Sequence, residues 1–294
     1  MTSIFINGPT IDPTNPWPDG TTVVYINDHY NPADMSLALK NKPVEKIIQS
    51  FFYLYPKNIE PIAWAPVYLK ALMSDLKCST VDVETQACFN FMLYKRRWLR
   101  ELAIQCIEEH SLTTPFYTLN FEGSTTPIKS FPDNHNTGNH IIDNWNNYLA
   151  NNVFLPTAVS LIIETLEPQW GPCMTYTEKT MYPIMALTLP IWLGGYQQAQ
   201  GFKELGFDTF DDVVDHSYQY IEDPQESISR AIKDNYRLLT DLEHAKEIRR
   251  RVMPRLIDNR NYAMSNPFDQ MITQRINQNY PNFDQRLRRF IRLK

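Results

Sequence analysis

Glu178 and Lys179 are the two residues of this chain whose types and position best suit chemistry. They follow a polar segment, residues 175–177, that is suited to begin a helix, and apolar residues recur after them at helical spacing. Because the first turn of a helix carries unpaired N–H groups and a partial positive charge, Lys179 beside it would suit a diphosphate. Glu178 would accept hydrogen bonds from ribose hydroxyls. The same residues are also typical of an ordinary capped amphipathic helix, so the pattern alone leaves both interpretations open.

These residues must be positioned by a strand that follows the helix almost at once. Residues 189–193 form a short apolar run, which predicts a buried strand, and Gly194 and Gly195 then free the backbone to turn sharply. The turn falls at the carboxyl end of the strand, which is where open α/β sheets bind ligands. We therefore expect the helix start and this strand end to form one site.

Earlier segments predict further strands. The apolar runs at residues 22–27, 88–93 and 158–163 are each fit for a buried strand, and residues 98–109 are expected to form a helix. Glu164 directly follows the last of these runs. Strands that alternate with helices favour a parallel sheet covered by helices, so the predicted fold class is α/β.

The segment 175–195, TYTEKTMYPIMALTLPIWLGG, resembles the donor-binding segment of fucosyltransferase-like glycosyltransferases of the GT-B fold. In that family a Thr-Glu-Lys helix start leads to an alanine-containing helix and a strand that ends in glycine. Residues 202–232, FKELGFDTFDDVVDHSYQYIEDPQESISRAI, are similar to uncharacterised phage-encoded proteins that share the Glu-Lys block. The resemblance covers about residues 86–240. It implies a GT-B-like fold and transfer of a sugar from a nucleotide-diphosphate sugar to an acceptor hydroxyl, with no bound metal and no further cofactor.

The resemblance also implies roles for particular residues at the donor site. The glutamate and lysine of the family's block, here Glu178 and Lys179, hold the ribose and the diphosphate. Tyr176 and Thr177 lie at the same helix start and are expected to bind the donor with them. Glu164 matches an acid that the phage-encoded relatives place at a strand end, where it would orient the loop or touch the donor sugar.

Two further groups complete the expected site. In the family an arginine at the start of the helix after the first donor-domain strand reaches the diphosphate, and Arg97 is our first choice, with Arg96 and Arg100 as substitutes. If the reaction inverts the sugar, a base must come from the N-terminal part of the chain. Asp28 and His29, at the end of the first strand, are the candidates for that catalytic role. Ordinary loop or helix-start residues remain the alternative for both groups.

Three sections are expected along the chain. Residues 1–85 are predicted to form a small, truncated N-terminal α/β unit on the acceptor side, with a helix at residues 43–55. Residues 86–240 would form a Rossmann-like domain that binds the nucleotide sugar. Residues 241–294 would form a basic helical C-terminal section. A long helix is expected across the junction of the last two sections, at residues 224–251.

Length and composition indicate a folded protein rather than a disordered one. The chain has 294 residues, of which 43% are hydrophobic. The N-terminus lacks the pattern of a signal peptide and no apolar run approaches a membrane span, so we expect no membrane partner and a cytoplasmic location, in the host if the protein is viral. Four cysteines without CxxC spacing argue against a zinc site or a disulfide framework. Asp211 and Asp212 are adjacent and would point apart, so we expect no metal site there.

Charge is distributed unevenly. Residues 246–294 contain twelve lysines and arginines against four acidic residues, a net charge of +8 in a chain whose formal net charge is −5. Such a section could bind a polyanion, and a hydroxymethylated base in phage DNA is one acceptor that the resemblance allows beside a glycan or a protein. The more ordinary interpretation is a helical face paired with the acidic remainder of the chain. The oligomeric state stays open.

Other classes of function are weighed against the transferase. The chain contains no GxGxxG and no GxSxG, which argues against a nicotinamide-dependent oxidoreductase and a serine hydrolase. A non-catalytic viral binding or structural protein on a glycosyltransferase scaffold remains the alternative, because the first 85 residues match nothing in the family.

Overall fold

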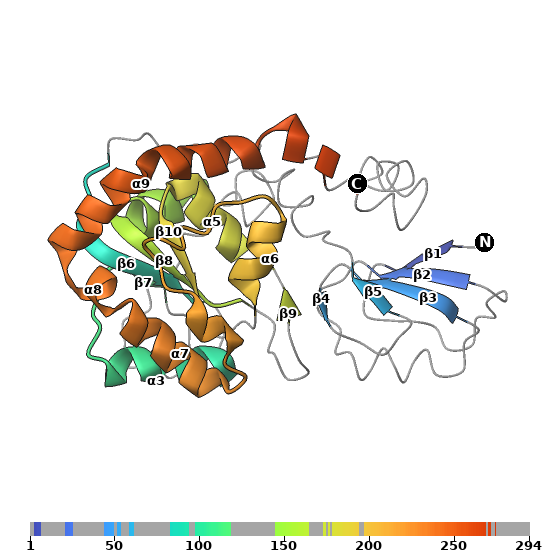
Figure 1. The fold of residues 1–294 in the computed structure, drawn as a ribbon, viewed down its shortest axis with the longest axis horizontal. Coiled ribbons are helices and arrows are strands. Elements are labelled where there is room, and N and C mark those ends of the chain that lie inside the picture. The colour runs from blue at the N-terminus through green and yellow to red at the C-terminus, as the bar shows by residue number, and fades with distance from the viewer. Residues whose placement is uncertain are drawn as a thin grey trace.

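The structure is a computed structural model of the chain, shown in Figure 1. It describes residues 83–93, 98–118, 145–164, 176, 178–193, 197–268, 270–271 and 274. For the short strands between residues 3 and 61, and for Cys173–Met174, it describes the backbone.

A four-stranded parallel sheet organises the larger part of the described chain (Figure 1). Its strands, in the order β10-β8-β6-β7, are Leu189–Trp192, Thr157–Ile162, Ala87–Met92 and Tyr117–Thr118. All three pairings are parallel. Strand β8 is buried along its whole length, as expected for an apolar strand whose sheet is covered on both faces. The predicted parallel α/β sheet is confirmed.

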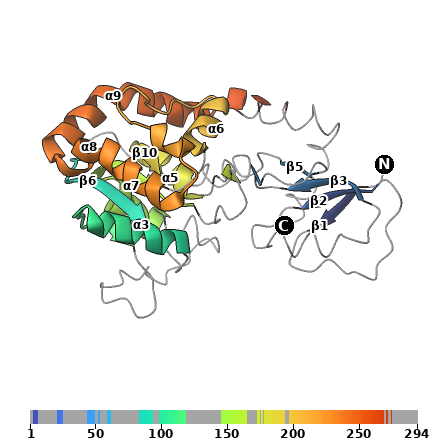
Figure 2. The same cartoon turned by 60° about the horizontal axis from the view of Figure 1, so that its bottom comes forward.

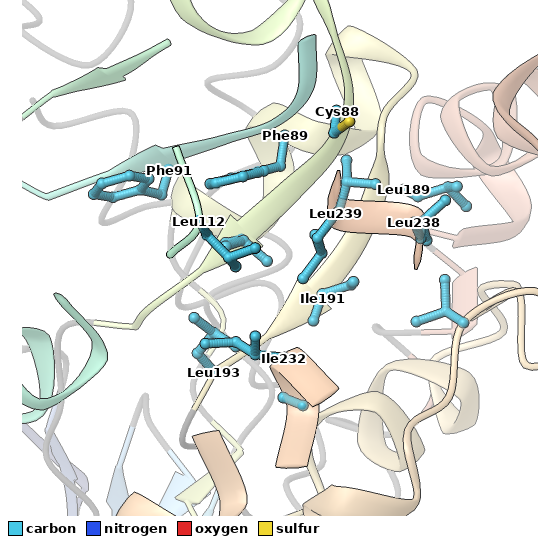
Figure 3. Close-up of a cluster of buried hydrophobic side chains, with 14 of the residues drawn as sticks. Cys88, Phe89, Phe91, Leu112, Leu189, Ile191, Leu193, Ile232, Leu238 and Leu239 are labelled. Carbon is cyan, nitrogen blue, oxygen red and sulfur yellow. The ribbon is translucent and has the colours of Figure 1, made fainter. Parts of the chain in front are cut away.

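The sheet separates two hydrophobic cores because side chains of a strand alternate between its faces. On β10, Leu189 and Ile191 enter one core while Trp192 enters the other. Figure 3 shows the core that contains Leu189 and Ile191. In it Ile191 lies near Leu239 and Leu193 lies beside Ile232, and both of these partners belong to the covering helices. The two cores hold the ends of the described strands in fixed positions.

Helices cover both faces of the sheet. One face is covered by η1, α5 and α6, which span Trp145–Phe154, Glu178–Ala186 and Gln198–Glu204. The other is covered by α3, α7, α8 and α9, which span Trp98–Glu109, Pro224–Asp234, Tyr236–Thr240 and Leu242–Ala263. Helix α3 has the predicted bounds and lies beside α7 in both Figure 1 and Figure 2. A single 3-10 turn, η2 (Ser217–Tyr220), precedes α7.

The long helix expected at residues 224–251 is wrong, since the chain breaks into α7, α8 and α9 there. Asn235 ends α7 because its buried amide group donates to the carbonyls of Asp215 and Ala231 and accepts from the N–H of Asp215. Asp241 then begins α9 by accepting a hydrogen bond from His244 N–H at 3.0 Å. Both breaks use short polar side chains that compete with the helix for backbone groups.

Three helices end in the same way, with one residue in the left-handed region. That residue is Ser111 after α3, Leu187 after α5 and Gly206 after α6, at φ values of 55°, 57° and 92°. In each case its N–H and the next N–H turn back to carbonyls of the last helical turn, which is the Schellman arrangement. After α5 this tight ending lets β10 begin at residue 189. Only residues 187 and 188 therefore connect the helix to the strand.

A second parallel sheet comprises four of the N-terminal strands. Its order is β1-β2-β3-β5, formed by Ser3–Ile6, Thr21–Tyr25, Val44–Gln49 and Ile59–Pro61. The helix expected at residues 43–55 is therefore wrong. Strand β3 pairs with β2 on one side and β5 on the other, and short apolar runs rich in β-branched residues cannot be told from helices by periodicity alone. The domain boundary at residue 85 stays a prediction.

Candidate active site

The carboxyl end of β8 and the first turn of α5 are joined by a buried hydrogen bond. Glu164 lies two residues beyond β8 and is 5% exposed, and Thr180 lies in the first turn of α5 and is 1% exposed. The Thr180 hydroxyl donates to Glu164 Oε1 across 2.6 Å. A carboxylate this far from water needs such donors, because its burial without hydrogen bonds is costly. The structure thus brings Glu164 to the first turn of α5, and its contact with a donor stays a prediction.

The end of β10 is hydrogen-bonded to the same threonine, Thr180. Trp192, the last residue of that strand, is fully buried, and its indole Nε1 donates to Thr180 Oγ1 across 3.1 Å. Thr180 therefore receives one hydrogen bond from β10 and gives one to Glu164 at the end of β8. Two neighbouring strands and the helix between them meet at this hydroxyl.

Glu178 and Lys179 form the first two residues of α5 and pair with each other. Lys179 Nζ lies 3.0 Å from Glu178 Oε1, and the two side chains are 6% and 27% exposed. Although Lys179 stands at the start of the helix, its side chain is buried. Its long aliphatic stem is enclosed by the protein while its ammonium group reaches the neighbouring carboxylate. A phosphate that binds here would meet an ammonium group that already pairs with Glu178.

The electrostatic influence of Glu178 extends along the helix. Tyr182, one turn later, is 2% exposed. Burial, and then the charge of Glu178, raise the pKa of the Tyr182 hydroxyl well above its usual value. Tyr182 therefore stays neutral, and its ring stacks against Trp145 with a centroid distance of 4.9 Å. Uncharged aromatic side chains, Tyr182 and Trp145, thus pack beside the turn of α5 that follows Glu178 and Lys179.

Tyr176 lies between α5 and α6. It is 2% exposed, and its hydroxyl donates to the carbonyl of Gln198, the first residue of α6, across 2.6 Å. Its ring packs against Phe202 at a centroid distance of 5.7 Å. These contacts position α6 relative to the helix start. A contact of Tyr176 with the donor stays a prediction.

Several predicted residues lie outside the described residues. They are Asp28, His29, Arg96, Arg97 and Thr177, together with Gly194 and Gly195 of the predicted turn. Arg100, a substitute for Arg97, is described, and it is 2% exposed in the first turn of α3. The assignments of the catalytic base and of the arginine that reaches the diphosphate therefore stay predictions.

Thr180 and Trp192 are the residues that sequence reasoning missed. Thr180 stands two positions after Glu178 within an apolar helix, and Trp192 ends an apolar strand. Both patterns are typical of core packing. The one available signal was that each side chain carries a polar group in a segment otherwise expected to be buried, since buried hydroxyls and indoles need partners.

A separate cavity of about 590 Å³ lies between α6, η2 and the start of α8. Asp211 is part of its lining and accepts from Lys203 Nζ at 2.9 Å, while His216 Nδ1 lies 3.1 Å from the same carboxylate. Burial lowers the pKa of His216, against the pull of Asp211. Glu164, Glu178 and Lys179 do not line this cavity. It is therefore distinct from the site at the sheet edge.

The acidic segment that follows α6 is engaged by arginine. Arg255 of α9 donates to both carboxylate oxygens of Asp208 and of Asp212, and its guanidinium lies 5.0 Å from the centre of the Phe210 ring.

Within the part of the chain that the structure describes, no group of three histidine, cysteine or acidic side chains is placed to hold a metal ion. No helix among the described residues is long and apolar enough to cross a membrane.

Two described arginines of the basic section contact the protein itself. Arg255 pairs with acidic residues of the body, and Arg249 is 5% exposed with its guanidinium directed at backbone carbonyls. Arg250 and Arg251 of the same helix are exposed. The residues after 274, which carry six of the section's twelve lysines and arginines, lie outside the described residues.

No family model matches the chain, and no curated protein matches it. Among solved structures, it is similar to the DNA-modifying enzyme β-glucosyltransferase, crystallised with and without uridine diphosphoglucose, with 12% identity and a TM-score of 0.41 over 93% of this chain and 74% of the other. It is also similar to a mutant of phage T4 BGT in complex with UDP-glucose, with 12% identity and a TM-score of 0.43 over 87% of this chain and 73% of the other.

Proposed function

We propose that this protein is a glycosyltransferase that moves a sugar from a nucleotide-diphosphate sugar to an acceptor hydroxyl. The observation that carries the proposal is the meeting of the α5 N-terminus, which bears Glu178 and Lys179, with the buried carboxylate of Glu164 at the carboxyl end of β8. Cation, helix N–H groups and carboxylates lie together at the edge of a parallel sheet, where such folds bind nucleotides.

Each group has a chemical role in the proposed transfer. Cleavage of the donor places negative charge on the leaving diphosphate, which the ammonium of Lys179 and the N–H groups at the start of α5 would stabilise. Glu178, released from Lys179, would accept hydrogen bonds from the ribose hydroxyls. Glu164 would accept from a hydroxyl of the sugar. Arg97 would add a second cation at the diphosphate.

The acceptor side of the proposal rests on the N-terminal section. Asp28 or His29 would remove the proton of the acceptor hydroxyl if the reaction inverts the sugar. The acceptor is a glycan or a hydroxymethylated base of phage DNA. A base within a duplex would have to leave the stack before its hydroxyl could reach the donor.

The ion pair between Glu178 and Lys179 favours one alternative, a non-catalytic binding protein on the same scaffold. A lysine already neutralised at 3.0 Å offers a leaving group less charge than a free one. This alternative predicts binding of nucleotide sugars without turnover. Measuring binding and transfer separately on the same preparation distinguishes the two functions.

The test uses calorimetry with UDP-glucose, a GDP-sugar, the nucleoside diphosphates and the free nucleosides. Lys179→Met keeps most of the buried stem and removes the charge. We expect it to weaken nucleoside diphosphate binding by about ten- to a hundredfold, the range for a hydrogen bond to a charged group, and to leave nucleoside binding unchanged.

Lys203→Met is the matched control, because Lys203 pairs with Asp211 at 2.9 Å in the separate cavity. It should bind the donor as the unaltered protein does. If the unaltered protein binds no nucleotide sugar of the panel, or if Lys179→Met binds nucleoside diphosphates with full affinity, the proposed function is wrong.

A further inference from the structure

We propose that Thr180 and Trp192 are positioning residues that hold the Glu164 carboxylate in the orientation needed to accept a hydrogen bond from a hydroxyl of the donor sugar. The proposal rests on the proposed function and deepens it. It concerns the sugar end of the donor, whereas Lys179 concerns the diphosphate.

The chemistry of the three groups gives the hydrogen bonds one direction. An indole N–H can only donate, so Thr180 Oγ1 must accept from Trp192. The threonine hydroxyl has a single hydrogen, and it points to Glu164 Oε1 at 2.6 Å. An ionised carboxylate can only accept. Each group therefore has its role set by its neighbour, and the Thr180 hydroxyl has no second hydrogen with which to form a competing bond.

The anchor of this relay is rigid. Trp192 is fully buried, with its ring 5.2 Å from that of Phe202 and 5.8 Å from that of His216, measured between centroids. In the sheet, Trp192 pairs with Ile162, which precedes Glu164 by two residues. Strand pairing and aromatic packing thus fix the indole N–H relative to the start of the loop that bears the carboxylate.

Rotation of the Glu164 side chain would break a buried hydrogen bond and leave the Thr180 hydroxyl without an acceptor. Leaving a buried polar group unsatisfied is costly, so the relay restricts the carboxylate to one orientation. A site built to hydrogen-bond a substrate hydroxyl rejects analogues that lack it much more strongly than an apolar pocket does. The relay is therefore expected to govern selection of the sugar and not affinity for the nucleotide.

The experiment compares affinities for UDP-glucose and UDP by calorimetry, with a GDP-sugar and GDP in their place if the protein selects guanine. Thr180→Val removes the hydroxyl at nearly constant shape, and Thr180→Ser keeps it. We expect Thr180→Val to bind the nucleotide sugar at least about tenfold more weakly while binding the nucleoside diphosphate normally. Thr180→Ser should restore the affinity. Thr188→Val is the matched control, since Thr188 is a buried threonine that bonds Ser160 at the opposite end of β10.

A second measurement needs no ligand. Each of the six tryptophans contributes one indole N–H resonance, and that of Trp192 is assigned from its loss in Trp192→Phe. Thr180→Val and Glu164→Gln should both shift this resonance, and Thr188→Val should not. The shift caused by Glu164→Gln is informative because hydrogen bonds join Glu164 to the indole through the Thr180 hydroxyl.

The two measurements separate failure of this inference from failure of the proposed function. If the protein binds no nucleotide sugar although the indole resonance responds, the relay exists but the proposed function is wrong, and the positioning role falls with it. If nucleotide sugars bind and Thr180→Val binds them within twofold of the unaltered protein, the function stands and the positioning role is overturned. Equal losses for the sugar and the diphosphate, or failure of Thr180→Ser to restore binding, would also overturn it.

Discussion

Arg249 links the body of the protein to the far end of the helix that carries the candidate site. It lies on α9, is 5% exposed, and its guanidinium donates to the carbonyls of Leu187 and Ala186 at 3.1 and 3.4 Å. It also donates to Thr85 Oγ1 at 2.8 Å and to the carbonyl of Leu155 at 3.5 Å. Carbonyls at the end of α5 carry partial negative charge, which this cation offsets.

Arg249→Met should destabilise the protein because the methionine fills similar space and leaves these acceptors unsatisfied. Burial lowers the pKa of Arg249 to about 10, so the side chain is charged at neutral pH and the substitution removes a charge as well as donors. Each buried acceptor left unpaired costs about 1–3 kcal/mol, and release from the desolvation of a buried cation offsets part of that sum. We therefore expect a net loss of about 2–4 kcal/mol for methionine, and about half of it for Arg249→Lys, which keeps the charge without the planar fork.

The assay is urea unfolding followed by circular dichroism and by tryptophan fluorescence, with the shift of the midpoint as the result. Arg250→Met serves as the control, because Arg250 is the next residue of α9 and is exposed. The free energy of unfolding of Arg250→Met should stay within about 0.5 kcal/mol of that of the unaltered protein. If Arg249→Met is as stable as this control, Arg249 does not stabilise the end of α5, and the reasoning from its contacts is refuted.

Two predictions concern charge elsewhere. Burial by itself would raise the pKa of Asp211, but hydrogen bonds, above all the one from Lys203, lower it to about 2. Ionised Asp211 therefore stabilises the folded protein above its ordinary pKa of 3.8, and this contribution is lost as the pH falls toward 2. Because the side chain is 49% exposed, we expect an advantage of only about 1 kcal/mol over Asp211→Asn. Unfolding titrations should show this advantage in full at pH 5 and largely lost at pH 2, and an advantage independent of pH would contradict the assignment. If the acceptor is DNA, retention of a single-stranded oligonucleotide should fall steeply with salt and should weaken, with donor binding intact, when glutamine replaces Arg286, Arg288 and Arg289. Absence of salt-dependent retention at low ionic strength would exclude a DNA acceptor.

The sequence by itself determined the strands and helices that depend on local pattern. The strands predicted at residues 88–93, 158–163 and 189–193 and the helix at 98–109 are all present, to within one or two residues at their ends. Continuous apolar runs of this length identify strands buried on both faces without further information.

Tertiary contacts decided the elements that local pattern misassigned. Residues 44–49 satisfy a helical spacing as well as a strand, and pairing with β2 and β5 made them a strand. The apolar spacing after Pro224 continues through Asn235, yet that residue bonds to the backbone of Asp215, which lies 20 positions earlier. Nothing in the sequence around Asn235 specifies this partner, so the break in the helix could not be predicted.

For the candidate site, too, the sequence predicts some features and only the tertiary structure decides the others. Its residue types and their place at a helix start were available from the sequence and from the family that it resembles. The burial of Lys179 and the hydrogen bonds that join Trp192, Thr180 and Glu164 were not. These three residues belong to a strand, a helix and the end of another strand, and they meet only when β10 pairs with β8 and α5 packs on the sheet. Secondary structure follows from neighbours along the chain, whereas the partner of a buried polar group is set by packing.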